Sequence, residues 1–172
     1  ASSYPSRVIK GMRAAGHSVS FDPNLRPSLW PSQPRMIEEI DSLAALADWV
    51  LPGLAEGQLL TGRQRPEDIA AFYLERGAEA VVIKLGPQGA YYRSAAAEGY
   101  VEGRKVAKVV DTVGAGDGFA VGVVSALLEG HSLARAVARG NWVGSRAVQS
   151  PGDMEGLPLR ADLEQDERQH SA

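Results

Sequence analysis

The sequence contains no cysteine, and that absence removes several kinds of chemistry at once. A chain without cysteine has no disulfide, no cysteine-ligated zinc and no cysteine nucleophile, although its cellular compartment stays open. Histidine is scarce as well, because the chain has only His17, His131 and His170, and these lack metal-ligand spacing. We therefore interpret the three histidines as surface residues rather than metal ligands.

Neither sign of charge dominates the chain. It has 21 acidic and 18 basic residues, a formal net charge of −3, and no block of like charge. Nothing in this balance predicts binding to nucleic acid or to an anionic membrane surface. Long apolar runs are missing too, since the longest, over residues 120–128, is far too short to span a bilayer. The first residues lack a basic-then-apolar signal pattern, so we expect a soluble, cytoplasmic protein.

What remains is a chain of ordinary globular composition. Its 172 residues give room for one domain with a sizeable core, and 44% of them are apolar while 23% are charged. The chain begins with Ala1 instead of an initiator Met, which is compatible with a piece of a longer protein.

Strand and helix patterns alternate along the chain, which favours an α/β fold with a mostly parallel sheet. We expect strands over residues 17–22, 48–52, 80–85, 90–92 and 106–110. We expect helices over residues 7–15, 36–46, 56–60, 66–76, 116–129, 133–148 and 160–172. The run over 80–85 is apolar and β-branched, which is typical of a strand buried on both faces. The helix over 116–129 is apolar or small almost all round, so we expect it to be buried.

The segment over residues 109–119 carries the most chemical information. A strand ends there, the small residues Gly114, Ala115 and Gly116 follow, and an apolar helix begins. Small residues at a helix N-terminus let backbone amides approach an anion closely, and the helix dipole favours negative charge there. Asp117 in the first turn has two interpretations. Its carboxylate either caps the helix or accepts a hydroxyl proton beside a bound phosphate.

Several motifs resemble the PfkB/ribokinase family of sugar kinases. Residues 111–117, Asp-Thr-Val-Gly-Ala-Gly-Asp, resemble the C-terminal signature of that family. Residues 21–30, 51–62 and 83–90 resemble three further family segments in the family's order. Residues 151–158 are most similar to the keto-deoxygluconate kinases within the family.

The resemblance implies a ribokinase-like three-layer sandwich with a mostly parallel central sheet. It covers the C-terminal half to three-fifths of a family member, so residues 1–172 are identified as the C-terminal part of a PfkB-type kinase domain. The N-terminal half and the small β-lid over the sugar are the parts left out. The implied activity is ATP-dependent phosphorylation of 2-keto-3-deoxygluconate to its 6-phosphate. Two alternatives stay open: a fructokinase- or ribokinase-like activity on a neutral sugar, and a non-catalytic nucleotide-binding fragment.

The resemblance also implies roles for individual residues. Asp117 matches the catalytic base, and Gly114, Ala115 and Gly116 match the anion hole. Arg26 and Asp153 match residues that hold the sugar acid, although a lone Asp after Pro-Gly is also an ordinary turn former. The matches on the nucleotide side are Asn24, Lys84, Gly86, Gly89 and Asn141.

The implied cofactors are ATP and magnesium, with a monovalent cation as a further candidate. Glu56 matches the residue that organises magnesium through water, but Gly53 stands where the family has Asn. Asp111 and the Val113 carbonyl match a monovalent-cation site, and Asp111 can equally be a turn residue that closes the strand. The implied partners are ATP and a small sugar or sugar acid, and a homo-oligomer is compatible with the sequence.

Overall fold

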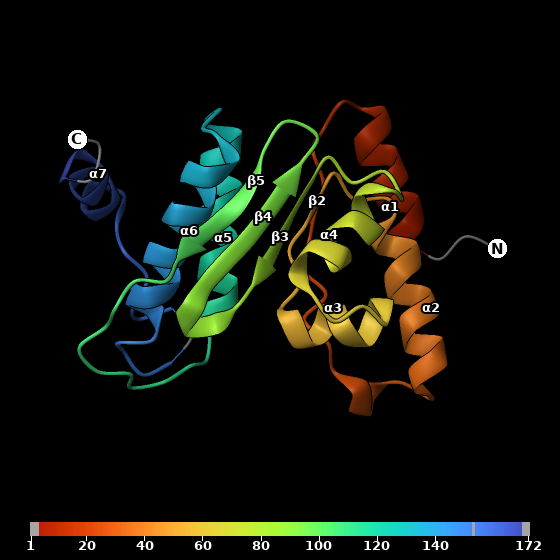
Figure 1. Ribbon diagram of the computed structural model, residues 1–172, viewed down its shortest axis with the longest axis horizontal. Coiled ribbons are helices and arrows are strands. Elements are labelled where there is room, and N and C mark those ends of the chain that lie inside the picture. The colour runs from red at the N-terminus through yellow and green to blue at the C-terminus, as the bar shows by residue number, and fades with distance from the viewer. Residues whose placement is uncertain (1–3, 153, 170–172) are drawn as a thin grey trace. The chain divides into compact units, whose positions relative to one another are not determined.

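The computed structural model describes residues 4–152 and 154–169. Contacts divide the chain into two compact units, Ala1–Glu102 and Gly103–Ala172, which are described separately below. The first unit holds the β-sheet, and the second is helical in its described part (Figure 1). Among the residues that the structure describes, no helix is long and apolar enough to cross a bilayer.

The sheet of the first unit has five strands in the order β1-β2-β3-β4-β5. These are β1 (Ser20–Phe21), β2 (Trp49–Val50), β3 (Ala80–Lys84), β4 (Gly89–Ser94) and β5 (Glu98–Glu102). The first three run parallel, and β4 and β5 continue the sheet as an antiparallel meander (Figure 1). The carboxyl ends of β1, β2 and β3 therefore meet at one edge, where open α/β sheets bind ligands.

Four helices accompany this sheet: α1 (Tyr4–Ala14), α2 (Gln33–Ala44), α3 (Leu54–Thr61) and α4 (Pro66–Leu74). Two short 3₁₀ turns, Pro27–Leu29 and Gly86–Gln88, lie in the loops after β1 and β3. Local sequence explains the boundaries. The Ser32 hydroxyl caps α2 by accepting from the Arg35 amide, and Gly62 ends α3 at a positive φ of 70°.

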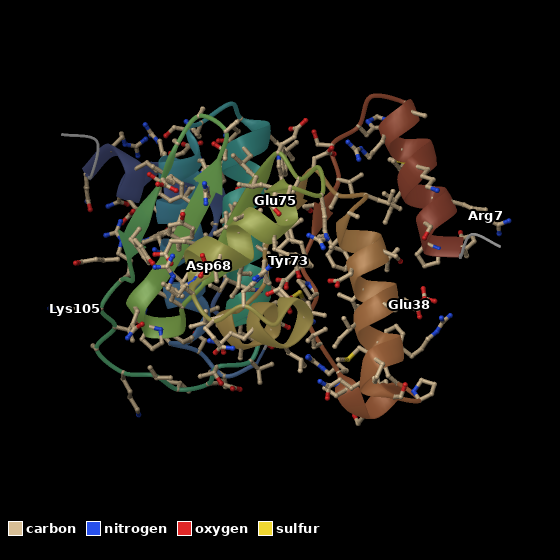
Figure 2. The ribbon with its side chains drawn as sticks, turned by 45° about the vertical axis from the view of Figure 1, so that its right-hand side comes forward. Arg7, Glu38, Asp68, Tyr73, Glu75 and Lys105 are labelled. Atoms are coloured by element: carbon tan, nitrogen blue, oxygen red, sulfur yellow. The ribbon has the colours of Figure 1, made fainter. Side chains whose placement is uncertain are left out.

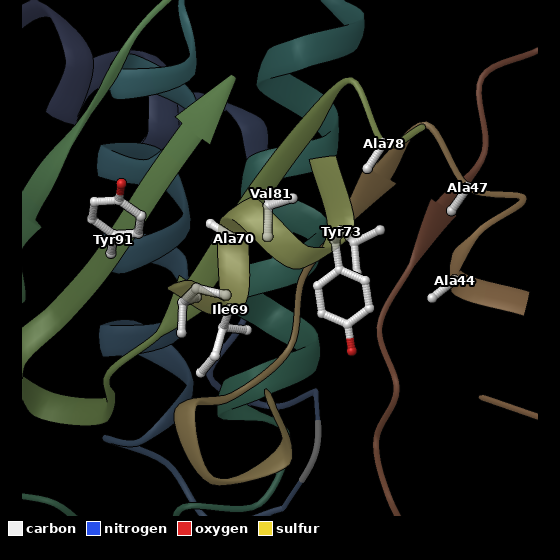
Figure 3. Close-up of a cluster of buried hydrophobic side chains, with 10 residues drawn as sticks. Ala44, Ala47, Ile69, Ala70, Tyr73, Ala78, Val81 and Tyr91 are labelled. Atoms are coloured by element: carbon white, nitrogen blue, oxygen red, sulfur yellow. The ribbon is translucent and has the colours of Figure 1, made fainter. Parts of the chain in front are cut away.

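The core of the first unit lies between α4 and the sheet. Residues 80–83 of strand β3 are buried as the apolar run predicted, and Figure 3 shows Ile69, Ala70 and Tyr73 of α4 beside Val81. A smaller cluster joins α2 and α3 through Met36, Ile40 and Leu60. Charged side chains such as Arg7 and Glu38 lie on the outside of α1 and α2 (Figure 2).

The second unit is built on a close crossing of α5 (Ala115–Leu128) and α6 (Leu133–Ala147). Glycines make the approach possible. A Cβ placed on Gly122 would lie 2.8 Å from the Gly140 Cα, and one on Gly140 would lie 3.0 Å from the Phe119 carbonyl oxygen. The two backbones therefore touch where any side chain would hold them apart.

A third helix, α7 (Arg160–Gln169), is joined to this pair by charge. Arg139 of α6 has a side chain only 2% exposed, and its guanidinium reaches Glu129 at 2.8 Å and Glu167 at 2.7 Å. The Ser125 hydroxyl accepts a third hydrogen bond from it at 3.3 Å. This buried cation thus fixes α7 to the α5–α6 pair, a contact that the sequence analysis did not predict.

Two predictions about this region are wrong. Helix α5 is buried on one face only, because Val121 and Leu128 on its other side are 60% and 69% exposed. The strand expected over residues 106–110 is absent, and the last strand is β5 instead. A strand needs a partner, and the described residues after Glu102 contain no strand. The Val110 amide donates to the Val148 carbonyl oxygen instead, at 2.8 Å.

Candidate active site

The loop that follows β1 is held by an ion pair. Asp22 lies at the carboxyl end of β1 and Lys84 at the carboxyl end of β3, and the Lys84 Nζ lies 2.5 Å from the Asp22 Oδ2. Both side chains are mostly buried, with exposures of 17% for Lys84 and 19% for Asp22. The Asp22 Oδ1 is buried and has no hydrogen-bond partner among the described residues. Burial raises the pKa of the Asp22 carboxyl, and Lys84 offsets part of that effect.

Glu56 in the first turn of α3 joins two loops. Its Oε1 accepts from the Leu25 amide and its Oε2 from the Gly53 amide, each at 2.8 Å. The Gly53 contact forms half of a capping box at the start of α3, while the Leu25 contact reaches into the loop after β1. Each carboxylate oxygen keeps a lone pair beyond these bonds, which fits the orientation of a metal-bound water.

Asn24 and Arg26 occupy the exposed part of the same loop. Asn24 has a φ of +41°, a conformation that Asn tolerates better than most residues. The Arg26 guanidinium donates to the Leu25 carbonyl oxygen at 3.0 Å and to that of Asn24 at 3.5 Å. These contacts leave most donors of the guanidinium available to an anion at the strand ends.

The loop between β3 and β4 has the shape that its glycines predict. Gly86 and Gly89 have φ values of 60° and 102°; Gly86 begins the Gly86–Gln88 turn and Gly89 follows it. Residues 86–88 are exposed, so their backbone is accessible to a ligand. Lys84 at the start of this loop turns its ammonium toward Asp22.

In the second unit, Asp111 organises the approach to α5. Its Oδ1 accepts from the Val113 amide at 3.0 Å, and its Oδ2 accepts a longer contact from the Gly152 amide at 3.5 Å. These hydrogen bonds lower the pKa of the Asp111 carboxyl, so that it stays ionised at neutral pH. An ionised carboxylate beside the exposed Val113 backbone is a donor set of the kind that hard cations take.

The predicted cradle forms the N-terminus of α5. Gly114 is the N-cap residue with a φ of 75°, and α5 begins at Ala115. In a helix that starts there, the amides of Gly116 and Asp117 have no intrahelical acceptor. Asp117 lies in the first turn and is exposed, and its carboxylate makes no hydrogen bond or ion pair within the chain that the structure describes. The carboxylate is therefore accessible to a substrate beside a group of amides that favours anions.

Two further predicted residues lie in the same unit. Asn141 is on α6 and is 7% exposed. Asp153 lies outside the described residues. The structure thus places Asp111 next to the Gly114–Asp117 cradle in one unit, and Asn24, Arg26, Glu56 and Lys84 at the strand ends of the other.

Sequence reasoning missed the part played by Asp22. The residue was visible at the end of a strand pattern, and Lys84 was visible at the end of another. Both positions follow from the rule that parallel strands end at one edge of the sheet. Their pairing depends on the strand order β1-β2-β3, which brings together residues 62 positions apart.

An α/β unit with loops at the carboxyl ends of its parallel strands, and a helix that starts at glycines beside a carboxylate, are features that recur in proteins that bind phosphate groups. The family model for pfkB family carbohydrate kinases matches residues 2–160. The chain belongs to this family.

Individual relatives agree with this assignment. The 2-dehydro-3-deoxygluconokinase of Bacillus subtilis (strain 168) is 58% identical over 156 residues, covering 91% of this chain and 48% of the relative. The crystal structure of a PfkB protein from Polaromonas sp. JS666 matches with a TM-score of 0.83 and 52% identity, over 93% of this chain and 50% of that one.

A more distant structure carries ligands. Aminoimidazole riboside kinase from Salmonella enterica, complexed with aminoimidazole riboside and an ATP analog, matches with a TM-score of 0.82 and 32% identity, over 92% of this chain and 55% of that one. These matches confirm the predicted α/β, ribokinase-like fold. The chain spans about half the length of the curated relatives that it matches.

Proposed function

We propose that this chain carries the C-terminal half of an ATP-dependent kinase for a sugar acid, with 2-keto-3-deoxygluconate as substrate and its 6-phosphate as product. The observation that carries the proposal is the exposed Asp117 carboxylate in the first turn of α5, beside the Gly114–Gly116 cradle. The 58% identity to a 2-dehydro-3-deoxygluconokinase supports this choice of substrate.

Asp117 acts as the general base in this proposal. Its carboxylate accepts the proton of the terminal sugar hydroxyl while that oxygen forms a bond to the γ-phosphorus of ATP. The bond from that phosphorus to the bridging oxygen breaks, and ADP leaves. The amides of Gly116 and Asp117 point at the charge that develops on the transferred phosphoryl group, which stabilises the transition state.

Arg26 provides the preference for an acid. Its guanidinium is exposed at the strand ends and can pair with the substrate carboxylate in a charge-assisted contact. Asp153 completes this side of the proposal by holding sugar hydroxyls. On the nucleotide side we propose Asn24, the Gly86–Gly89 loop with Lys84 at its start, and Asn141.

The chain's carboxylates fit two roles beside cations. Glu56 has each oxygen bonded to a backbone amide, so it fits the positioning of a water on magnesium rather than direct ligation. No group of three metal-ligating side chains occurs among the residues described. Asp111 and the Val113 carbonyl fit a monovalent cation next to the cradle. Magnesium bound with ATP would neutralise charge on the phosphates.

Asp117→Asn tests the proposal in a full-length kinase that contains these residues. Asn keeps the shape and the capping ability of Asp but cannot accept the hydroxyl proton. General-base assistance contributes about a hundredfold to ten-thousandfold, so turnover should fall by at least about a hundredfold while ATP affinity and thermal stability stay near wild type.

Asp162→Asn is the matched control. Asp162 also lies in the first turn of a helix, and its carboxylate accepts from the Leu159 amide at 3.0 Å. We expect this variant to keep full turnover. Normal turnover in Asp117→Asn would remove the proposed base. Wild-type enzyme that binds ATP but phosphorylates no sugar would favour a nucleotide-binding fragment, and faster turnover of fructose would favour a neutral-sugar kinase.

A further inference from the structure

The loop that bears Asn24 and Arg26 is attached to the rest of its unit by very little backbone. It follows β1, an edge strand of two residues that pairs with β2 alone among the described strands. Asn24 within it takes a left-handed conformation, which Asn tolerates better than most residues. Something besides the β-ladder must therefore fix the shape of this loop.

Two carboxylates fix the shape of the loop: Asp22 within it and Glu56 on α3. Asp22 at the start pairs with Lys84 on β3, and the Leu25 amide further along donates to Glu56 on α3. The second Glu56 oxygen holds the Gly53 amide after β2. Side-chain contacts thus connect the carboxyl ends of all three parallel strands.

The charges make Lys84 the critical member of this group. Burial raises the pKa of the Asp22 carboxyl most, Lys84 lowers it, and repulsion from Glu56 raises it by a smaller amount. The Lys84 ammonium is therefore the charge that offsets the burial of the Asp22 carboxylate, with which it pairs directly. Without it, Asp22 would be a buried carboxylate next to a like charge and with no opposite one, which disfavours the present conformation of the loop.

We propose that Lys84 is a positioning residue that acts through Asp22 to hold the loop bearing Asn24 and Arg26 in its binding shape. This inference rests on the proposed function of Arg26 as the residue that binds the sugar acid. It replaces the nucleotide-side role proposed for Lys84 with a role on the sugar side, in which the ammonium acts through Asp22. The same ion pair joins that loop to the start of the Gly86–Gly89 loop, so the two loops are positioned together.

Steady-state kinetics on the full-length kinase test this role. Lys84→Met keeps most of the side-chain volume and removes the charge. We expect the KM for the sugar acid to rise by at least about tenfold, as for loss of a charge-assisted contact, and the KM for ATP to rise as well, because the proposed nucleotide contact Asn24 lies on the same loop. Lys84→Arg should restore most of the affinity because it keeps the charge opposite Asp22.

A double-mutant cycle with Asp22→Asn separates coupling from independent effects. If the two residues act as a pair, Lys84→Met combined with Asp22→Asn should be no worse than the more damaging single variant. Lys10→Met is the matched control, because Lys10 is an exposed lysine on α1 of the same unit. It should leave both KM values unchanged.

Hydrogen exchange provides a readout that does not depend on catalysis. The Leu25 amide is protected by Glu56, so a released loop should exchange faster in peptides that contain residues 22–26. We expect faster exchange in Lys84→Met and Asp22→Asn at unchanged melting temperature, and no change in Lys10→Met.

Two results would overturn the inference: a rise in the KM for ATP alone, which makes Lys84 a nucleotide contact, or unchanged exchange in both single variants. If wild-type enzyme phosphorylates no sugar acid, the proposed function fails while the exchange measurement still decides whether Lys84 holds the loop.

Discussion

The glycine crossing of α5 and α6 allows a comparison of one substitution at two positions of a single helix. Gly118 and Gly122 lie one turn apart on α5, and both are buried. A Cβ on Gly118 would first meet the Leu157 Cδ2 at 3.1 Å, the end of a flexible side chain. A Cβ on Gly122 would meet the Gly140 Cα at 2.8 Å and the Arg139 carbonyl oxygen at 3.0 Å, which are backbone atoms.

The expected effects differ in sign. Replacing a helical glycine by alanine stabilises a helix by about 0.8–1.0 kcal/mol at either position. Overpacking costs about 1–3 kcal/mol where the neighbours cannot move. Gly122→Ala should therefore lower the free energy of unfolding by roughly 0–2 kcal/mol, because α6 must shift as a whole. Gly118→Ala should be neutral or stabilising by up to about 1 kcal/mol, because the Leu157 side chain can rotate away.

Equilibrium urea unfolding of the two variants and the wild type measures this difference. We expect the midpoint of Gly122→Ala to lie below that of Gly118→Ala, with an unchanged m-value. A thermal scan should show the same order, at about 2–4 °C for each kcal/mol. Equal midpoints, or a higher one for Gly122→Ala, would show that the helices do not depend on backbone contact at the crossing.

Two further predictions concern the site residues. Arg26→Ala in a full-length kinase should reduce turnover of the keto-acid sugar about tenfold to more than a hundredfold beyond its effect on fructose, because loss of a charge-assisted pair costs about 1.5–3 kcal/mol. Competition assays with the two sugars measure this ratio. Equal losses on both sugars would place Arg26 on the nucleotide. The pKa of Asp111 is lowered in the folded state, so its contribution to stability is present above the unfolded value of 3.8 and is lost as the pH falls through the folded value. Asp111→Asn should therefore be less stable than wild type at neutral pH and equal to it in strong acid. Melting curves measured across pH test this, and a difference in melting temperature that stayed constant with pH would contradict it.

The sequence predicts elements best where local chemistry decides them. The run over 80–85 is a buried strand, the proline at position 66 begins α4, and Asp117 falls in the first turn of α5. The strand predicted over 106–110 does not form, because β4 has another partner strand. Its β-branched valines suit a strand, but β4 pairs with 98–102 instead, where a tight turn brings Tyr91 opposite Tyr100.

Contacts between segments far apart in the sequence could not be predicted from the sequence. The Asp22–Lys84 pair depends on the strand order, and the burial of Arg139 depends on where α7 docks. Helical spacing does place Arg139 on the face of Ala136 and Val143, both buried, which was the available signal. The roles of Asp117, Arg26 and the other site residues stay predictions, because a fold positions side chains without showing their chemistry.

The shortness of β1 has a consequence for the order in which this unit loses structure. The β3–β5 meander joins neighbouring segments through pairings of five residues each, so it is local in sequence and well bonded. Among the described strands, the backbone pairing of edge strand β1 reaches the meander through β2, with two paired residues at each step. Opening of that edge costs few backbone hydrogen bonds, so it belongs to the low-energy fluctuations of the native state. If Arg26 binds the sugar acid as proposed, substrate recognition depends on this readily opened edge, while the meander keeps its pairing.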